Sequence, residues 1–293
     1  MKDLIIIGAG PAGLTAGIYA KRYNLDFLVI GQTPGGTAIE AWQIENYPGF
    51  KSIAGLDLMQ KFQEQLGQKI IQENIEKITK DFLVYTDKNQ CQGKTLILAM
   101  GSKNRKLGLE NEEKFLGRGI SYCVTCDGPL FKDKIVAVVG GGNAALTGAL
   151  ELADIAKKVY LIHRRDEFRA DPIWQEKIKQ NKKIEIIFNT RVVQVKGDKI
   201  LEKIILDSSR ELEVSGLFIE IGTTPSSGLA QDLAITLEND FIVVDKNQAT
   251  NIPGVFAAGD ITNNPLKQII SACGQGAVAS FSAFQYVYAK HKN

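Results

Sequence analysis

The sequence predicts an α/β protein of two domains, the second inserted into the first. Two observations lead there: a glycine-rich turn occurs twice, and two later segments have the composition of connections between domains. The chain has 293 residues, and domains commonly span about 100–200 residues, so its length suits two domains. We expect residues 1–108 and 227–293 to form the first domain and residues 109–226 the second.

The repeated unit is a strand, a glycine-rich turn, a helix and a second strand. Residues 8–17 read GAGPAGLTAG and residues 140–149 read GGGNAALTGA, with five of the ten positions identical. Each turn follows an apolar run and opens a stretch of small residues, which is the context that a dinucleotide-binding turn requires. The predicted elements are strands 4–7 and 27–30 around a helix over about 11–23, and strands 135–139 and 159–162 around a helix over 143–155.

Each glycine of such a turn has a physical task. The first permits a tight bend, the second lets the backbone approach a pyrophosphate, and the third lets helix and strand pack closely. The N-terminus of the helix then offers unpaired N–H groups and a positive dipole end to the phosphates. The residues concerned are Gly8, Gly10, Pro11, Ala12 and Gly13 in the first copy, and Gly140, Gly142, Asn143, Ala144 and Ala145 in the second. We therefore predict two dinucleotide-binding, Rossmann-like domains of three layers; the alternative is a pair of glycine turns that open ordinary core helices.

The two copies differ after their second strand, where such a domain binds the adenosine ribose. The second copy has His163, Arg164 and Arg165 there, followed by Arg169. Guanidinium groups match phosphate oxygens in a bidentate manner, so this pattern favours NADP(H) over NAD(H). The alternative is a solvated basic loop. The first copy has Gly31 and Gln32 with no acid, so Gln32 or the backbone would have to hold the ribose.

The remaining segments can be assigned in outline. We expect a helix over 56–74, a strand over 94–100, strands in a meander over 184–221 and a strand over 252–260. A helix over about 268–289 begins with small residues, which allow close approach of a ligand or another backbone; a packed core helix is the alternative. The two crossings between domains are expected at 102–119 and 222–228.

Composition excludes several classes of protein. The 35 Lys and Arg residues nearly balance 33 Asp and Glu, giving a formal charge of +2, so no electrostatic argument favours a nucleic acid or an anionic membrane as partner. No segment reaches the roughly 18 consecutive apolar residues of a membrane span. Four cysteines are too few for a secreted scaffold held by disulfides. The expectation is a cytoplasmic protein.

Two of the cysteines, Cys123 and Cys126, form a C-x-x-C pair. In a cytosolic chain with βαβ units this spacing indicates a dithiol–disulfide redox site. A structural zinc site is the alternative, but it needs four ligands, and the two histidines, His163 and His291, do not form a pair. A merely structural disulfide is a further alternative. Asp127 follows the pair and is either a proton donor to a departing thiolate or a turn-forming residue.

In this order, the motifs resemble the low-molecular-weight thioredoxin reductases along essentially the whole chain. The placement of the C-x-x-C pair just before the second glycine-rich turn makes the set specific. The matching elements are IIIGAGPAGL (5–14), GG…ENYPGF (35–50), the strand ending at Gly101, CVTCDG (123–128), GGGNAA (140–145), HRRDEFRA (163–170), GVFAAGD (254–260) and KQIISACGQGAVA (267–279).

The resemblance implies FAD on the first turn and NADPH on the second. Asp260 would bind the ribityl chain of the flavin, Gln268 and its helix would face the flavin ring, and Asn46 would lie in a loop nearby. Cys126 would meet the flavin, Cys123 would attack the partner disulfide, and Asp127 would be the acid–base group. The other flavin-site positions that the motifs match are Gly36, Thr37, Ala99, Gly101, Gly259, Lys267 and Ile269. Thr37 and Met100 depart from the family's usual Gln and Thr.

The implied activity is the transfer of electrons from NADPH through FAD and the cysteine pair to a thioredoxin-like protein disulfide, by a homodimer. A related reductase with ferredoxin as donor or a peroxiredoxin-type acceptor is the alternative, and a non-catalytic redox sensor is a third reading. The cysteines would have to reach both the flavin and a protein partner. We therefore predict rotation of the inserted domain about residues near 105–118 and 222–228.

Overall fold

The computed structural model describes residues 1–41 and 44–289. The chain forms two compact units: Met1–Ala41, Tyr47–Lys103 and the chain from Thr224 onward make unit 1, and Asn104–Thr223 makes unit 2, to which the described residues 44–46 are also assigned. Unit 2 is therefore inserted into unit 1. Its limits lie a few residues before the predicted 108/109 and 226/227.

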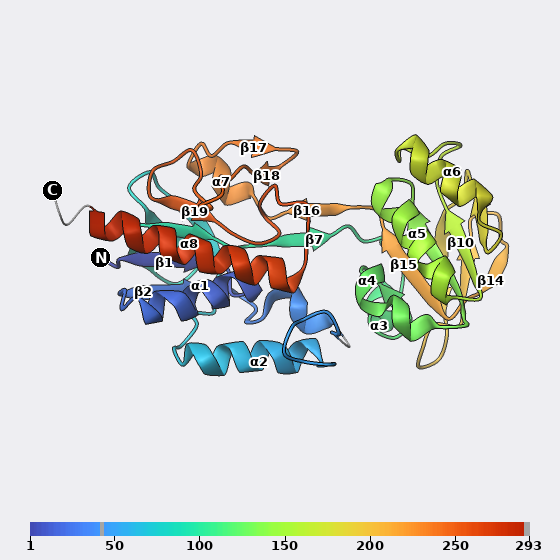
Figure 1. Ribbon diagram of the computed structural model, residues 1–293, viewed down its shortest axis with the longest axis horizontal. Coiled ribbons are helices and arrows are strands. Elements are labelled where there is room, and N and C mark those ends of the chain that lie inside the picture. Colours follow the sequence, from blue (N-terminus) through green and yellow to red (C-terminus); the bar gives the residue numbers. More distant parts are fainter. Residues whose placement is uncertain (42–43, 290–293) are drawn as a thin grey trace. The chain divides into compact units, whose positions relative to one another are not determined.

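Unit 1 is built on a parallel sheet of four strands, of which β1, β2 and β19 are labelled in Figure 1. The strand order is β19 (Val255–Ala257), β6 (Leu96–Leu98), β1 (Leu4–Ile7), β2 (Phe27–Ile30). All four residues of β1, sequence LIII, are buried. Continuous apolar runs of this kind are typical of parallel strands that are covered on both faces.

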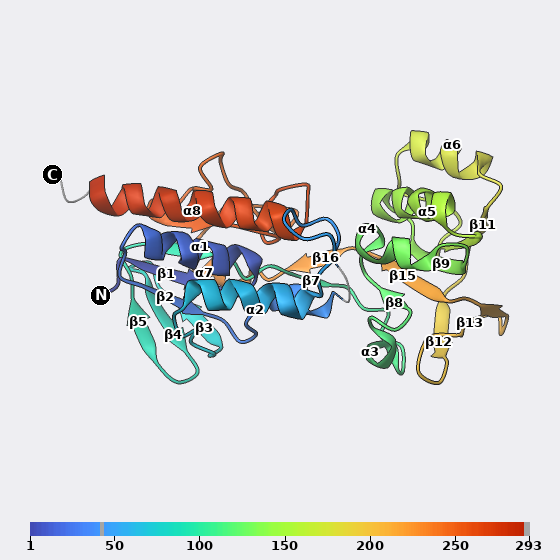
Figure 2. The ribbon, with the colours of Figure 1, turned by 60° about the horizontal axis from the view of Figure 1, so that its bottom comes forward.

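Helices cover one face of this sheet. Helix α1 (Pro11–Arg22) and helix α8 (Ile269–Ala289) lie side by side (Figures 1 and 2). Their backbones approach so closely that a Cβ on Gly276 would lie 2.2 Å from the carbonyl oxygen of Ala12. The small residues of α8 thus serve packing against α1. Helix α2 (Gly55–Leu66) completes this layer.

An antiparallel sheet covers the other face of the parallel sheet. It consists of β3 (Ile75–Ile78), β4 (Leu83–Thr86) and β5 (Gln90–Gln92), and the short helix α7 (Gly228–Asp232) joins it. Side chains alternate along a strand, so one set of β1 and β6 residues faces this layer. The buried core here includes Ile5, Ile7, Leu96, Leu98, Ile78, Val84, Ala230 and Leu233. The remaining elements of unit 1 are η1 (Gly36–Glu40), β17 (Leu237–Glu238) and β18 (Phe241–Ile242).

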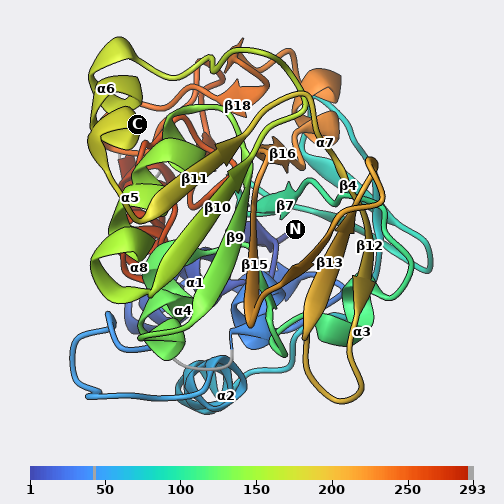
Figure 3. The same cartoon turned by 90° about the vertical axis from the view of Figure 1, so that its right-hand side faces the viewer.

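Unit 2 contains a parallel sheet of five strands, seen in Figure 3. The strand order is β11 (Ile184–Ile187), β10 (Lys158–Ile162), β9 (Ile135–Gly140), β15 (Gly216–Glu220), β8 (Ile120–Ser121). Consecutive residues Val136, Ala137 and Val138 of β9 are fully buried. This strand is therefore also covered on both faces.

The two faces of this sheet have different cover. Helices α5 (Asn143–Ile155) and α6 (Pro172–Gln180) pack on one face. The antiparallel strands β12 (Val192–Lys196), β13 (Lys203–Leu206) and β14 (Glu211–Glu213) pack on the other. Short helices α3 (Glu112–Phe115), α4 (Val124–Asp127) and η2 (Gly128–Phe131) lie before β9.

Both units thus have three layers around a parallel sheet, and the prediction of two Rossmann-like domains is confirmed. The predicted meander over 184–221 was wrong in part, since its first and last strands, β11 and β15, belong to the parallel sheet. The helix predicted over 56–74 ends at Leu66, because Gly67 adopts a left-handed φ of 59° and caps it.

The two crossings contain the strands β7 (Ser102–Asn104) and β16 (Thr223–Pro225), which pair as a two-stranded sheet. Among the described residues, no helix is long and apolar enough to span a membrane.

Candidate functional site

The first glycine-rich turn leaves no room for side chains at its outer glycines. Gly8 has a φ of +112°, and a Cβ there would lie 2.1 Å from the carbonyl oxygen of Ala99. A Cβ on Gly13 would lie 1.9 Å from the carbonyl oxygen of Gly8. These two glycines are therefore required by the fold of unit 1 itself.

The middle glycine of this turn is open. A Cβ on Gly10 would meet only the Cα of Gly36, at 3.8 Å. Gly10 is also the N-cap of α1 and provides no side-chain hydrogen bond to it, so the first N–H groups of the helix are left for another partner. Gly36, with a φ of +58°, faces Gly10. The two glycines form a cradle of bare backbone that suits a pyrophosphate.

The C-terminal part of unit 1 returns to this turn. A Cβ on Gly259 would lie 3.0 Å from the Cβ of Ala12. The Gly259 N–H donates to Oε1 of buried Gln275, at 2.6 Å. Segments almost 250 residues apart in sequence therefore meet at the start of α1. The sequence analysis missed Gln275, which lies among the small residues of α8 and fixes this loop.

Asp260 and Lys267 influence each other beside this loop. Burial raises the pKa of the Asp260 carboxyl, and the charge of Lys267 opposes that rise. Burial lowers the pKa of Lys267, with Asp260 opposing. The Lys267 ammonium donates to the carbonyl oxygen of Asp260 at 3.1 Å and lies 4.3 Å from the ring centroid of Phe241. The two residues are half-buried and lie beside this loop.

Other predicted flavin-site residues lie apart from these contacts. Gln32, Thr37 and Asn46 have exposed side chains, and their roles stay predictions. Gly101 has a φ of +69° and open space where a Cβ would be. Gln268 and Ile269 are partly buried. Gln268 directly precedes α8, and Ile269 is its first residue.

The second glycine-rich turn repeats the plan of the first. A Cβ on Gly140 would lie 2.3 Å from the carbonyl oxygen of Glu220, whereas a Cβ on Gly142 would meet nothing within 4 Å. Asn143, the first residue of α5, exchanges two hydrogen bonds with Asp171, at 2.9 and 2.8 Å. Ala144 beside it is exposed, and Ala145 is buried. The turn is therefore open at its middle glycine and held at both sides.

The basic residues after β10 surround this turn. The Arg169 N–H donates to the carbonyl oxygen of Gly141 at 2.7 Å. The side chains of Arg164, Arg165 and Arg169 are exposed, and no ion pair involves them in the described part of the chain. Three guanidinium groups are thus available to an external anion.

His163 differs from its basic neighbours because its ring is buried. A Cβ on Gly141 would lie 2.2 Å from the ring, so the imidazole packs directly on the turn. Burial, reinforced by the charge of Arg165, lowers the pKa of His163. Its Nε2 is buried without a hydrogen-bond partner among the described residues. The neutral ring supports the turn.

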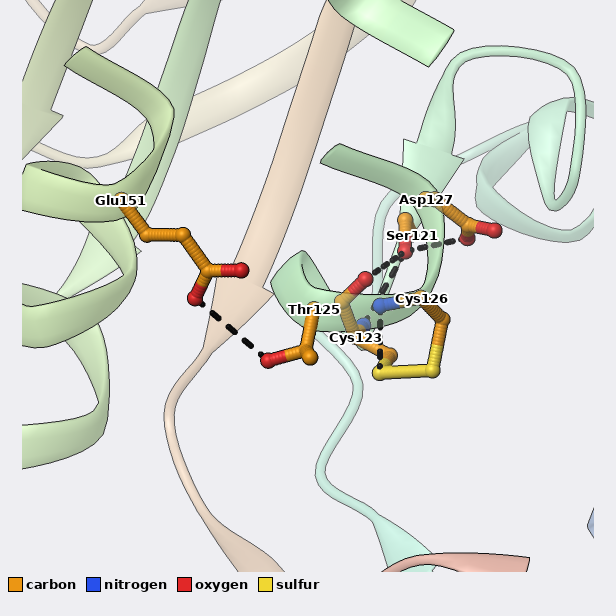
Figure 4. The surroundings of a disulfide bond; sticks show 6 residues. All are labelled: Ser121, Cys123, Thr125, Cys126, Asp127 and Glu151. Atoms are coloured by element: carbon orange, nitrogen blue, oxygen red, sulfur yellow. Dashed lines mark hydrogen bonds between the residues drawn. A yellow bond between two sulfur atoms is a disulfide. The ribbon is translucent and has the colours of Figure 1, made fainter. Parts of the chain in front are cut away.

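The cysteine pair lies at the start of α4 in unit 2: Cys123 is the N-cap of this helix, shortly after β8, and Cys126 lies within it (Figure 4). Cys123 and Cys126 form a disulfide, with Cα atoms 5.3 Å apart. The Cys126 N–H donates to the sulfur of Cys123 at 3.2 Å. A hydrogen bond of this kind stabilises a thiolate, so the turn favours Cys123 as the charged sulfur once the disulfide is open.

Asp127 is held beside the pair by Ser121. The Ser121 hydroxyl donates to Oδ2 of Asp127 at 2.6 Å and accepts from the Cys123 N–H at 3.0 Å. Burial raises the pKa of Asp127, and the bond from Ser121 opposes it. The other oxygen, Oδ1, is buried with no partner in the described structure. A buried carboxyl with a raised pKa can carry a proton at this place.

The sequence analysis missed three polar residues around the pair. Ser121 is one; the only signal for it was a hydroxyl two positions before the first cysteine. Glu151 and Glu220 are the others. Glu151 Oε2 accepts from the Thr125 hydroxyl at 3.4 Å (Figure 4). Glu220 ends the apolar strand β15, and its single acid within the run GLFIE was a usable signal.

Comparison with known proteins agrees with this geometry. The family model described as pyridine nucleotide-disulphide oxidoreductase matches residues 2–276. The chain is similar to the thioredoxin reductases of Listeria monocytogenes, at 39% identity with 97% of this chain and 93% of that protein covered, and of Mycoplasma genitalium, at 40% with 94% and 92%.

Solved structures give the same result. The crystal structure of thioredoxin reductase from Streptococcus pyogenes superposes with a TM-score of 0.91, at 37% identity and 99% coverage of both chains. A ferredoxin-flavin thioredoxin reductase from Clostridium acetobutylicum has a TM-score of 0.54, at 36% identity and 98% coverage of both chains. Nearly the whole chain is thus matched by the family model and by its relatives, and this protein belongs to the pyridine nucleotide-disulphide oxidoreductase family.

Proposed function

We propose that this protein is a flavoprotein that reduces thioredoxin-like protein disulfides with electrons from NADPH. One observation carries the proposal: the Cys123–Cys126 disulfide lies in the same unit as a glycine-rich turn surrounded by exposed arginines. Relatives of similar length that carry the name thioredoxin reductase support it.

The two glycine-rich turns fit the two cofactors. Bare backbone at Gly10 and Gly36 suits the pyrophosphate of FAD in unit 1, and Gly142 suits that of NADPH in unit 2. Arg164, Arg165 and Arg169 would bind the 2′-phosphate that distinguishes NADPH from NADH. Asp260 and Gln268 would contact the flavin, as the family resemblance implies. When bound, the two cofactors supply the electron pair that opens the Cys123–Cys126 disulfide.

The residues of the pair would then act on the partner. Cys123, as thiolate, attacks one sulfur of the partner disulfide, forming a mixed disulfide and releasing the partner's other sulfur as a thiolate. Cys126 then attacks the Cys123 sulfur, which restores the disulfide and releases the second partner sulfur. Asp127 carries the proton that a departing thiolate takes up. Cys126 itself would be the sulfur that receives electrons from the flavin.

The donor is the part of this proposal with an alternative. The Clostridium acetobutylicum structure is named as a ferredoxin-flavin thioredoxin reductase, and a peroxiredoxin-type acceptor is a further variant. The three exposed arginines favour NADPH, since a ferredoxin-dependent enzyme has no need of a site for a 2′-phosphate.

An anaerobic titration of the full-length yellow protein tests the donor and the acceptor in turn. We expect NADPH to bleach the flavin absorbance and NADH to bleach it weakly at the same concentration. Addition of an oxidised thioredoxin should then restore the absorbance. A colourless protein that takes up no flavin would refute the proposal, and bleaching by reduced ferredoxin alone would favour the alternative. Homodimer formation stays a prediction, for which sedimentation equilibrium is the measurement.

A further inference from the structure

Glu220 lies next to the redox pair without belonging to its predicted machinery. Strand β15 pairs with β8 in parallel, with Leu217 opposite Ile120 and Phe218 opposite Ser121. Continued by two residues, this register sets Glu220 level with Cys123. On its other side, Glu220 is paired with Gly140, the first glycine of the second turn. The strand therefore ends in an acid between the turn and the cysteines.

The surroundings of Glu220 are unfavourable to a negative charge. Its carboxylate accepts a hydrogen bond from the Val124 N–H, the residue directly after Cys123. Burial raises the pKa of Glu220 to about 7, and the charge of Glu151 adds to the rise while the Val124 bond opposes it. Glu220 thus changes charge near neutrality, which an ordinary surface glutamate does not do.

The groups that face Glu220 come from three elements. Helix α4 presents the Val124 N–H. Helix α5 presents the Glu151 carboxylate, which also accepts from the Thr125 hydroxyl; strand β9 presents only backbone, at Gly140. Helix α5 packs tightly here, since a Cβ on Gly148 would lie 2.9 Å from a methyl carbon of Val124. Asp127 of α4 bonds to Ser121 instead.

We propose that Glu220 is a positioning residue for the redox pair, whose charge, modulated by Glu151, sets how readily Cys123 becomes a thiolate. Opening the disulfide takes up two electrons and one proton, and it leaves one thiol and one thiolate. A negative charge on Glu220 disfavours the thiolate, and a protonated Glu220 does not. Part of the proton uptake on reduction would therefore occur at Glu220. The inference rests on the redox role proposed for the pair.

The test uses the full-length protein, with glutathione as redox buffer and iodoacetamide as probe of the thiolate. Peptide mass spectrometry follows alkylation of Cys123 alone, between pH 5.5 and 8.5. Glu220→Gln keeps an acceptor for the Val124 N–H and removes the titration. We expect this variant to alkylate about threefold faster than the wild type at pH 8, and to shift the glutathione equilibrium towards the dithiol by a similar factor. At pH 5.5 the two proteins should behave alike.

Two further variants make the result specific. Glu151→Gln removes the negative charge that raises the pKa of Glu220. In proteins that carry Glu151→Gln, the alkylation rates with Glu220 and with Gln at position 220 should therefore begin to differ at a lower pH. Glu202→Gln changes an exposed acid of the same unit and should change nothing. Equal behaviour of Glu220→Gln and wild type at every pH would overturn the inference. An equally large increase in the alkylation rate of Glu220→Gln at pH 5.5 would also overturn it, since that would indicate a structural disturbance. Neither the alkylation rate nor the glutathione equilibrium needs NADPH, flavin reduction or thioredoxin, so failure of the proposed function would be seen separately.

Discussion

The two glycine-rich turns share a backbone and differ in the side chains placed on it. In each, a Cβ on the first glycine would strike the carbonyl oxygen of a residue on the neighbouring chain segment: Ala99 for Gly8, at 2.1 Å, and Glu220 for Gly140, at 2.3 Å. The same position therefore carries a methyl group in unit 1 and a partly buried carboxyl in unit 2. The backbone determines where the turn lies, and the substituent beside it decides whether the site responds to pH.

A second difference lies after the second strand of each copy. Unit 1 continues with Gly31 and exposed Gln32, whereas unit 2 continues with buried His163 and two exposed arginines. A Cβ on Gly31 would lie 2.7 Å from the backbone nitrogen of Ala9, so this position in unit 1 is closed by packing. The corresponding edge of unit 2 is left open and positively charged. Ligand choice thus depends on this edge more than on the glycines.

The largest effect is expected where backbone leaves no alternative to glycine. Gly8→Ala places a Cβ against the carbonyl of Ala99 at a φ of +112°, which combines backbone strain with overpacking. We expect unit 1 to lose about 4 kcal/mol or more of unfolding free energy, measured by urea denaturation, or the protein to be insoluble.

Gly142→Ala is the matched substitution at an open glycine. Gly142 has a φ of −101° and no neighbour within 4 Å of a Cβ, so stability should change by less than about 0.5 kcal/mol. NADPH affinity should nevertheless fall about tenfold, because the methyl group occupies the space of the pyrophosphate. A large loss of stability for Gly142→Ala would contradict the distinction between structural and ligand-facing glycines.

Glu220 of unit 2 occupies the position that Ala99 has in unit 1. This difference predicts that the stability of unit 2 depends on pH. The pKa of Glu220 is raised in the folded protein from 4.5 to about 7, so the folded state binds more protons than the unfolded state between these values. Stability is then full below about pH 4.5 and falls as the pH rises to 7. Glu220→Gln should remove this loss and stabilise unit 2 by about 2–3 kcal/mol at pH 8, with little effect at pH 5.

Urea denaturation at both pH values measures this effect, and Glu213→Gln on exposed β14 is the control. Equal stabilisation at pH 5 and pH 8 would mean that removal of the charge is not the cause.

The sequence predicted the repeated architecture because glycine spacing and apolar runs are local signals. The positions of α1, α5 and α8 follow directly from them. These local signals do not show which side chains from distant parts of the chain lie beside the cysteines. Glu220 becomes a neighbour of the pair only through the pairing of β8 with β15, strands that lie almost 100 residues apart. The predicted 184–221 meander was wrong at its first and last strands for the same reason, because sheet membership is decided by long-range pairing.

The charged edge of unit 2 predicts a selective effect on cofactor choice. Arg165→Gln removes one guanidinium that makes no internal ion pair in the described chain, so the fold should be unaffected. A charge-assisted hydrogen bond contributes about 1.5–3 kcal/mol, and KM for NADPH should therefore rise about tenfold or more while KM for NADH stays unchanged. Arg118→Gln, an exposed arginine of the same unit, is the control. A parallel rise for both cofactors would argue against a 2′-phosphate site.

The smallest effect concerns a half-buried acid in each unit whose pKa is raised by burial. In unit 1, the charge of Lys267 lowers the pKa of Asp260 against the effect of burial. In unit 2, a neutral group, the Ser121 hydroxyl, lowers the pKa of Asp127 in the same way. Ser121→Ala should therefore raise the pKa of Asp127 further. The carboxyl then keeps its proton to higher pH, so the alkaline limb of the pH profile of disulfide turnover should move to higher pH, while turnover near neutral pH should change by no more than about threefold. In an Asp127→Asn background the substitution should leave the profile in place. A shift that persists there would assign the limb to another group, with Glu220 as the neighbouring acid to change next.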